Sequence, residues 1–260
     1  MSISKLTLMT KMINIFKEYI KKMKFAEIVK QEIGNKSELS LKEINCPDCF
    51  VAKIEIEIYQ NFGHIKYLEN SIVDYKNRHV LDKKLKAEDY PIIAIVLESP
   101  HIEEFDAEVS PLKNPFSANI LNDYLNKNLF YYITATQACG NVFFKAIRNI
   151  ENGIYRIKLV NAVQFQCSLG KSLKEKKNQK IKNDILEKCL SEKLFQEDLV
   201  SRIKDASIII NCCTGQKDGK ISGAQRQVQN IIDINYPSKR RLYGYHPSSL
   251  HFLRGFKDIT

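Results

Sequence analysis

The sequence lacks the features that would place it in a membrane or secreted class. No segment approaches the roughly 20 consecutive apolar residues that a bilayer-spanning helix needs. Lys5 and Lys11 interrupt the first apolar residues and no small-residue cleavage site follows, so we predict no signal peptide. The seven cysteines are odd in number and irregularly spaced, which favours a reducing compartment over a disulfide framework. We therefore expect a cytoplasmic protein with no membrane partner.

Positive charge is what the sequence has in excess. Its 260 residues are 44% hydrophobic, enough to bury the core of one compact domain or of two small ones. Forty Lys and Arg residues against thirty Asp and Glu give a net charge of +10, spread along the chain. A basic surface favours a polyanion such as nucleic acid, because phosphate contacts release counterions. Lysine-rich surfaces also serve solubility alone, so charge does not decide between the two.

The first third of the chain predicts a helix followed by a hairpin. Apolar residues recur at helical spacing over about residues 11–33, with lysines on the other face, and Gly34 marks the end of this helix. We expect the lysine face to be solvated. Isoleucine and glutamate alternate from Lys53 to Tyr59 as in a half-buried strand, and Asn61-Phe62-Gly63 suits a hairpin turn. Residues 1–88 are thus expected to form an extension of helix and hairpin.

From Pro91 onward, short apolar runs alternate with helical stretches. This pattern predicts an α/β domain over residues 89–260, a three-layer α/β/α sandwich around a mainly parallel, four-stranded sheet. The predicted strands are Ile92–Leu97, Ile157–Val163, Ser207–Ile210 and Leu242–Tyr245, and the predicted helices are Ser117–Asn126, Gln137–Ile150, Lys176–Ile203 and Ser222–Ile234.

Polar motifs follow three of the predicted strands. Glu98-Ser99-Pro100 ends the first strand, Asn161 caps the second, and His246 follows the last. Because ligands of open parallel sheets bind beyond the C-terminal ends of the strands, we expect these motifs to meet in one site. The loop from His246 to Leu250 suits one task, which is to offer a neutral imidazole to a developing anion beside an apolar wedge.

These motifs resemble those of the uracil-DNA glycosylase superfamily over about residues 91–256. Tyr245-His246-Pro247-Ser248-Ser249-Leu250, with Arg254-Gly255-Phe256 after it, looks like the family's His-Pro-Ser-Pro-Leu loop. Val160-Asn161-Ala162-Val163 resembles the strand that carries the family's base-reading asparagine, and Pro115-Phe116-Ser117 resembles the segment that stacks on the extracted base. Leu97-Glu98-Ser99-Pro100-His101 occupies the place of the family's first motif.

The resemblance implies a monomeric, monofunctional DNA glycosylase. Such an enzyme hydrolyses the N-glycosidic bond of a flipped, non-standard pyrimidine in DNA and leaves an abasic site. The base is either uracil or a bulky 5-modified cytosine of phage DNA, since some members of the superfamily act in phage defence. The alternative is a catalytically inactive DNA-binding module of the same fold, because Ser99 stands where the best-known branch of the family has an aspartate.

The resemblance also implies a role for each catalytic residue. His246 hydrogen-bonds the departing pyrimidine as negative charge develops on it. Handling of the attacking water falls to Glu98, beside Ser99, with Glu103 or Glu104 as the other candidates.

Base and DNA contacts follow from the same resemblance. Asn161 reads the Watson–Crick edge, and Gln164 or Gln166 is the candidate partner that fixes its amide and so decides between uracil and cytosine. His101 replaces a tyrosine that shields pyrimidine C5, which leaves room for a 5-substituted base. The remaining contacts are base stacking by Phe116, filling of the vacated stack by Leu250, and DNA binding by Ser248, Ser249 and Arg254.

The cysteines raise the question of a metal. Cys46-Pro47-Asp48-Cys49 is a CxxC, and Cys167 and Cys189 follow the asparagine strand. This order resembles that of a thermophile-associated branch of the superfamily, which carries a [4Fe–4S] cluster. A zinc site or buried thiols without metal are the alternatives. No cofactor is expected to be required for the chemistry itself.

Overall fold

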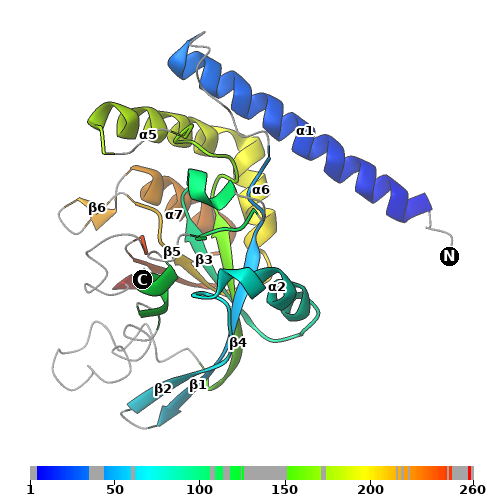
Figure 1. The fold of residues 1–260 in the computed structure, drawn as a ribbon, viewed down its shortest axis with the longest axis vertical. Coiled ribbons are helices and arrows are strands. Elements are labelled where there is room, and N and C mark those ends of the chain that lie inside the picture. The colour runs from blue at the N-terminus through cyan, green and yellow to red at the C-terminus, as the bar shows by residue number, and fades with distance from the viewer. Residues whose placement is uncertain are drawn as a thin grey trace.

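The computed structural model shows an α/β protein built on one mixed sheet (Figure 1). It describes residues 5–34, 44–59, 62–105, 109–113, 118–123, 125, 151–170, 174–214, 216–217, 220–221, 223–244, 246–247 and 257–258. Within these ranges, no helix has the length and apolar character needed to cross a membrane.

The sheet has seven strands in the order β2-β1-β4-β3-β5-β8-β9. Their bounds are β1 (Cys49–Tyr59), β2 (Phe62–Asn70), β3 (Ile92–Leu97), β4 (Gly153–Asn161), β5 (Ala206–Asn211), β8 (Arg240–Tyr243) and β9 (Lys257–Asp258). The four neighbours β4, β3, β5 and β8 are parallel, whereas β2, β1 and β9 pair antiparallel. A separate small hairpin consists of β6 (Gln216–Lys217) and β7 (Lys220–Ile221).

The helices whose bounds lie within the described residues are α1 (Lys5–Ile33), α2 (Arg78–Lys86), α5 (Lys176–Ser191), α6 (Lys193–Ile203) and α7 (Gly223–Asn235). Short 3-10 turns form at η1 (Tyr75–Asn77) and η2 (Ile102–Phe105). The helix predicted over residues 176–203 is broken at Glu192, where the backbone is extended with a ψ of 126°. The helix predicted over residues 137–150 lies outside the described residues.

The predicted four-stranded sheet is wrong in its extent, since it is only the middle of a larger, mixed sheet. All four predicted strands form, but β1 also pairs antiparallel with β4, from Cys49 opposite Leu159 to Ile56 opposite Gly153. The hairpin that we expected in a separate extension therefore continues the same sheet. Its alternation of isoleucine and glutamate indicated a half-buried strand but carried no information on the strand it would join.

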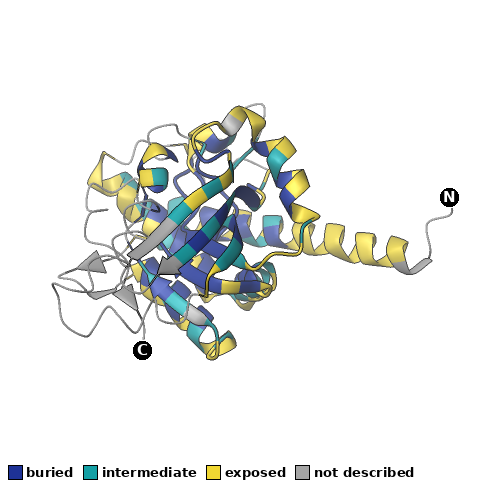
Figure 2. Ribbon diagram, turned by 90° about the horizontal axis from the view of Figure 1, so that it is seen from below, coloured by how far each residue is buried: buried dark blue, intermediate teal, exposed yellow. Residues whose placement is uncertain are grey.

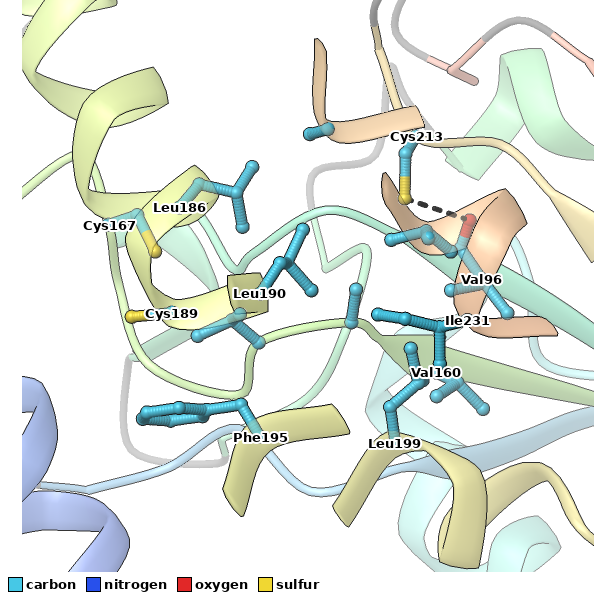
Figure 3. Close-up of a cluster of buried hydrophobic side chains, with 14 of the residues drawn as sticks. Val96, Val160, Cys167, Leu186, Cys189, Leu190, Phe195, Leu199, Cys213 and Ile231 are labelled. Atoms are coloured by element: carbon cyan, nitrogen blue, oxygen red, sulfur yellow. Dashed lines mark hydrogen bonds between the residues drawn. The ribbon is translucent and has the colours of Figure 1, made fainter. Parts of the chain in front are cut away.

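Successive residues of the central strand β3 point into two different cores. Ile93, Ile95 and Leu97 face a core that β1 helps to build, together with Ala118, Leu121 and Leu125. Ala94 and Val96 face the core under α5, α6, α7 and the second half of α1 (Figure 3). Both faces of β3 are therefore buried, which explains its uninterrupted apolar sequence.

Gln225 of α7 ties the end of β5 to the segment after β8. Its amide nitrogen donates to the carbonyl oxygens of Asn211, at 3.2 Å, and Gly244, at 2.7 Å. The Gly244 N–H in turn donates to the Asn211 carbonyl at 2.9 Å. Because Gly244 lies two residues before His246, this network fixes the point from which the histidine loop departs.

Gln225→Met should lower the free energy of unfolding by about 1–3 kcal/mol, because the Gly244 carbonyl loses a buried donor. Urea unfolding measures this loss. Gln227→Met on the same helix is the matched control, since the Gln227 amide donates to the Glu187 carbonyl at 3.4 Å, and it should cost less than about 0.5 kcal/mol. Equal losses in the two variants would contradict a specific role for Gln225.

Candidate functional site

The C-terminal ends of the parallel strands meet at one edge of the sheet. Leu97 of β3 lies opposite Asn161 of β4, and Asn211 of β5 lies opposite Tyr243 of β8. The residues that follow these strands therefore converge, as the sequence predicted for Glu98, Asn161 and His246.

Glu98 is buried, and both oxygens of its carboxylate are engaged. The Lys182 ammonium of α5 donates to Oε2, while the N–H of Thr214, at 2.9 Å, and the Thr214 hydroxyl donate to Oε1. Burial acts to raise the pKa of Glu98, but Lys182, His246 and the Thr214 N–H together bring it below its ordinary value. Glu98 is thus a carboxylate at neutral pH, held in place by a buried ion pair.

His246 is 6% exposed and presents a neutral imidazole. Burial lowers its pKa to about 4; the Glu98 carboxylate opposes this shift, whereas the positive charges of His101 and Lys182 add to it. The His246 and His101 rings lie edge to face, with centroids 6.5 Å apart. A neutral imidazole has one N–H group, and this group can donate a hydrogen bond to an anion.

Asn161 has a buried amide that makes no hydrogen bond. The residue is 1% exposed, and neither Nδ2 nor Oδ1 has a partner in the described part of the chain. Leaving such a group unpaired costs about 1–3 kcal/mol, a cost that a ligand with one acceptor and one donor would remove. Gln164 and Gln166, the candidate partners from sequence, contact Asp48, at 3.4 Å, and Ser168, at 3.3 Å, instead.

Glu104 in η2 is the ionisable residue beside Asn161. Burial raises its pKa to about 7, although the N–H groups of His101 and Leu112 and the Asn161 amide act to lower it. The amide is thus close enough to influence the carboxyl, but it forms no hydrogen bond of normal geometry. The Cys46 thiol lies 3.9 Å from Glu104 Oε2.

Leu112 has a left-handed φ of 52°, a conformation that costs a non-glycine residue about 1–2 kcal/mol.

Of the other predicted site residues, three belong to the described part of the chain and five lie outside it. Ser99 is buried next to Glu98, whereas His101, just before η2, and Glu103, within it, are exposed. The predicted stacking, wedge and DNA-binding residues lie outside the described residues, namely Phe116, Ser248, Ser249, Leu250 and Arg254.

The four cysteines predicted as metal ligands do not come together. Cys49 belongs to the core on one face of the sheet, whereas Cys167 and Cys189 lie together in the core on the other face (Figure 3). Across the described ranges, no group of three or more His, Cys, Asp or Glu side chains is arranged to hold a metal ion. These residues do not fit a four-thiolate centre, so the iron–sulfur cluster stays a prediction that the arrangement does not support.

Sequence reasoning missed Lys182 and Thr214. Lys182 lies on the buried face of α5, in line with the apolar residues Ile185, Leu186 and Cys189. A lysine within such a stripe is the signal that would have identified it, because lysine is almost never fully buried unless it is paired. Thr214 had no comparable signal, since its position depends on how the loop after β5 returns to Glu98.

No protein-family model, curated protein or solved structure matches this chain. What the site can do is therefore argued from its own residues and from their contacts.

Lys182→Met should lower the free energy of unfolding at pH 7 by about 3–5 kcal/mol, because it leaves Glu98 as a buried, unpaired charge. The folded protein holds the pKa of Glu98 below its ordinary value of 4.5. Ionised Glu98 therefore stabilises the fold above that pH, and this contribution is lost as the pH falls through the folded pKa. The difference between variant and wild type should shrink towards acidic pH, where protonation relieves the unpaired charge in the variant.

Urea unfolding across this pH range is the measurement, and Lys180→Met is the matched control. Lys180 pairs with Asp184 at 2.5 Å on the exposed face of the same helix, so its loss should cost less than about 1 kcal/mol. A Lys182 variant as stable as the Lys180 variant would show that the buried ion pair does not hold this site.

Proposed function

We propose that the protein is a DNA glycosylase, as the family resemblance of its motifs implies, with the three-layer α/β/α fold that its alternation of strands and helices predicts. It would hydrolyse the N-glycosidic bond of a flipped pyrimidine, either uracil or a 5-modified cytosine, and leave an abasic site. The observation that carries this proposal is the buried, unpaired amide of Asn161, at the same edge of the sheet as the neutral imidazole of His246. The net charge of +10 suits a DNA partner.

The proposed chemistry uses the neutral state of His246. As the bond between the sugar C1′ and the base N1 breaks, its electron pair moves onto the base, and negative charge develops at O2. The His246 N–H donates to this oxygen, a contribution of about 3 kcal/mol. Water adds its hydroxyl to C1′, and its proton ends on the base. Asn161 holds the base by one donor and one acceptor throughout.

Glu98 would act next to the sugar. A carboxylate has about four lone-pair sites, and the described contacts occupy three of them. The remaining site on Oε2 can accept a hydrogen bond from the attacking water, while the negative charge stabilises the cationic sugar. Lys182 keeps the carboxylate ionised in this buried position, but it also offsets part of its charge.

That offset favours the second candidate, a catalytically inactive DNA-binding module. Ser99 lacks the carboxylate of the best-known branch, and Glu98 shares its charge with Lys182. Oligonucleotides that carry uracil or a modified cytosine separate the two candidates, because alkali and heat convert each abasic site into a strand break. DNA binding without strand breaks on any base would favour the inactive module.

His246→Ala should lower the single-turnover rate of base excision by on the order of 10²–10³, while affinity for abasic DNA stays close to that of wild type. His79→Ala is the control, since His79 lies exposed on α2 and should not affect the rate. Excision at the wild-type rate by the His246 variant would remove this residue from the mechanism.

Glu104 should make base preference depend on pH. When ionised, the Glu104 carboxylate accepts a hydrogen bond from Asn161 Nδ2, and Oδ1 is left to accept from an amino group such as that of cytosine. When protonated, Glu104 can donate a hydrogen bond to Oδ1, and Nδ2 is left to donate to the O4 of uracil. Because its pKa is raised to about 7, the ratio of modified-cytosine to uracil excision should rise as the pH passes through about 7.

Single-turnover rates for both substrates over this pH range check the prediction. Glu104→Gln should remove the change in the ratio, because its amide does not titrate. The matched control, Glu103→Gln, changes an exposed neighbour and should retain it. A ratio that varies in the same way in wild type and in the Glu104 variant would exclude this role for Glu104.

A further inference from the structure

Helix α1 has two apolar faces, and the body of the protein covers only one of them. In its second half, Phe25, Ile28 and Val29 are buried in the core under α5 and α6. Lys21 extends the same face and donates to Asp198 of α6 at 2.6 Å. These contacts fix which side of α1 faces the rest of the chain.

The first half of α1 projects away from the body (Figures 1 and 2), and every residue from 7 to 20 is exposed. Its large apolar side chains are between 38% and 70% exposed: Leu8, Met9, Met12, Ile13, Ile15, Phe16, Tyr19, Ile20 and Met23. At about 100° per residue, they span an arc of roughly 160° centred near Phe16 and Met23. This arc lies on the side of the helix opposite to Phe25, Ile28 and Val29, so the described body of the protein does not cover it.

Lysines border this apolar face on both sides. On the same helical projection, Lys11 and Lys22 lie along one edge and Lys17 along the other. Lys24, farther along the second edge, pairs with Glu192 at 3.2 Å and with Glu27 at 3.3 Å. Glu18 is the one acidic residue among the first 24, and it lies within 2.5 Å of Lys21. From residue 7 to residue 23, the uncovered face is therefore apolar along its centre, with Lys11 and Lys22 along one margin and Lys17 along the other.

We propose that this face of α1 lies on the surface of an anionic phospholipid bilayer. An interfacial helix places large apolar side chains at the boundary of headgroups and acyl chains, and flanking lysines reach the phosphates. The body packs on the opposite face of α1, so a flat surface can approach the apolar arc. We expected no membrane partner from the sequence because it has no spanning segment, but a helix that lies on the surface needs none.

A second copy of the chain fits this face less well. Two such helices packed face to face would bring lysines of one copy against lysines of the other along both edges, and like charges there oppose pairing. The arc of roughly 160° is also wider than the seam that one partner helix covers. Negatively charged headgroups match both the width of the face and the sign of its margins.

Co-sedimentation of the full chain with lipid vesicles tests the proposal. The wild type should bind vesicles of phosphatidylcholine mixed with phosphatidylglycerol, should bind pure phosphatidylcholine much less, and should be released by salt. Phe16→Glu should weaken binding at least about tenfold, because it removes an aromatic ring that the bilayer would bury and adds a negative charge next to anionic headgroups.

Asn14→Glu is the matched control, because it adds the same charge to the same helix on the face turned away from the lipid. It should keep most of the binding, and circular dichroism should show equal helix content in the two variants. Absence of binding to anionic vesicles, or equal loss in both variants, would overturn the proposal. Light scattering that showed a wild-type dimer, abolished by Phe16→Glu, would assign the face to a second copy instead.

Discussion

The ion pair between Glu98 and Lys182 joins the end of the central strand to the helix that covers one face of the sheet. β3 lies between β4 and β5, so a charge fixed at its C-terminal end lies where the loops from both neighbouring strands begin. Thr214, from the loop after β5, completes the coordination of the same carboxylate. Without this pair, a buried negative charge would stand unbalanced in a region where three loops converge.

The same cluster sets the electrostatics of His246 and leaves Asn161 apart from it. Burial, aided by the charge of Lys182, keeps the imidazole neutral, whereas the amide of Asn161 lies beside a second carboxyl, that of Glu104. The pKa values of these two buried acids shift in opposite directions, since Lys182 contacts Glu98, whereas no cation among the described residues contacts Glu104. Environments that separate two like groups in this way are typical of catalytic sites, but structural networks also produce them.

The strands and the edge of the sheet that carries the site were predictable from sequence, whereas the sheet's full extent and the internal contacts of the site were not. Both ends of the strand Ile92–Leu97 were predicted to the residue, because a short apolar run with a clear start and end indicates a buried strand. The run at residues 157–163 misplaced both ends of β4, since Ala162 and Val163 are buried beyond the strand and residues 153–156 extend its start by pairing with β1. The break at Glu192 carried no glycine or proline to mark it.

Lys182 and Thr214 reach Glu98 through tertiary packing, which no local pattern encodes.

The place of β4 in the sheet bears on the order in which the protein can fold. β4 pairs with β1 on one side and with β3 on the other, and both partners precede it by long stretches of chain. Closing such long loops costs entropy before any contact stabilises them, so sheets of this kind form late and slowly. Asn161 ends β4, so its amide cannot take its buried position on a nascent chain that has not yet produced this strand. The buried, unpaired amide should therefore form only with the last cooperative step of folding.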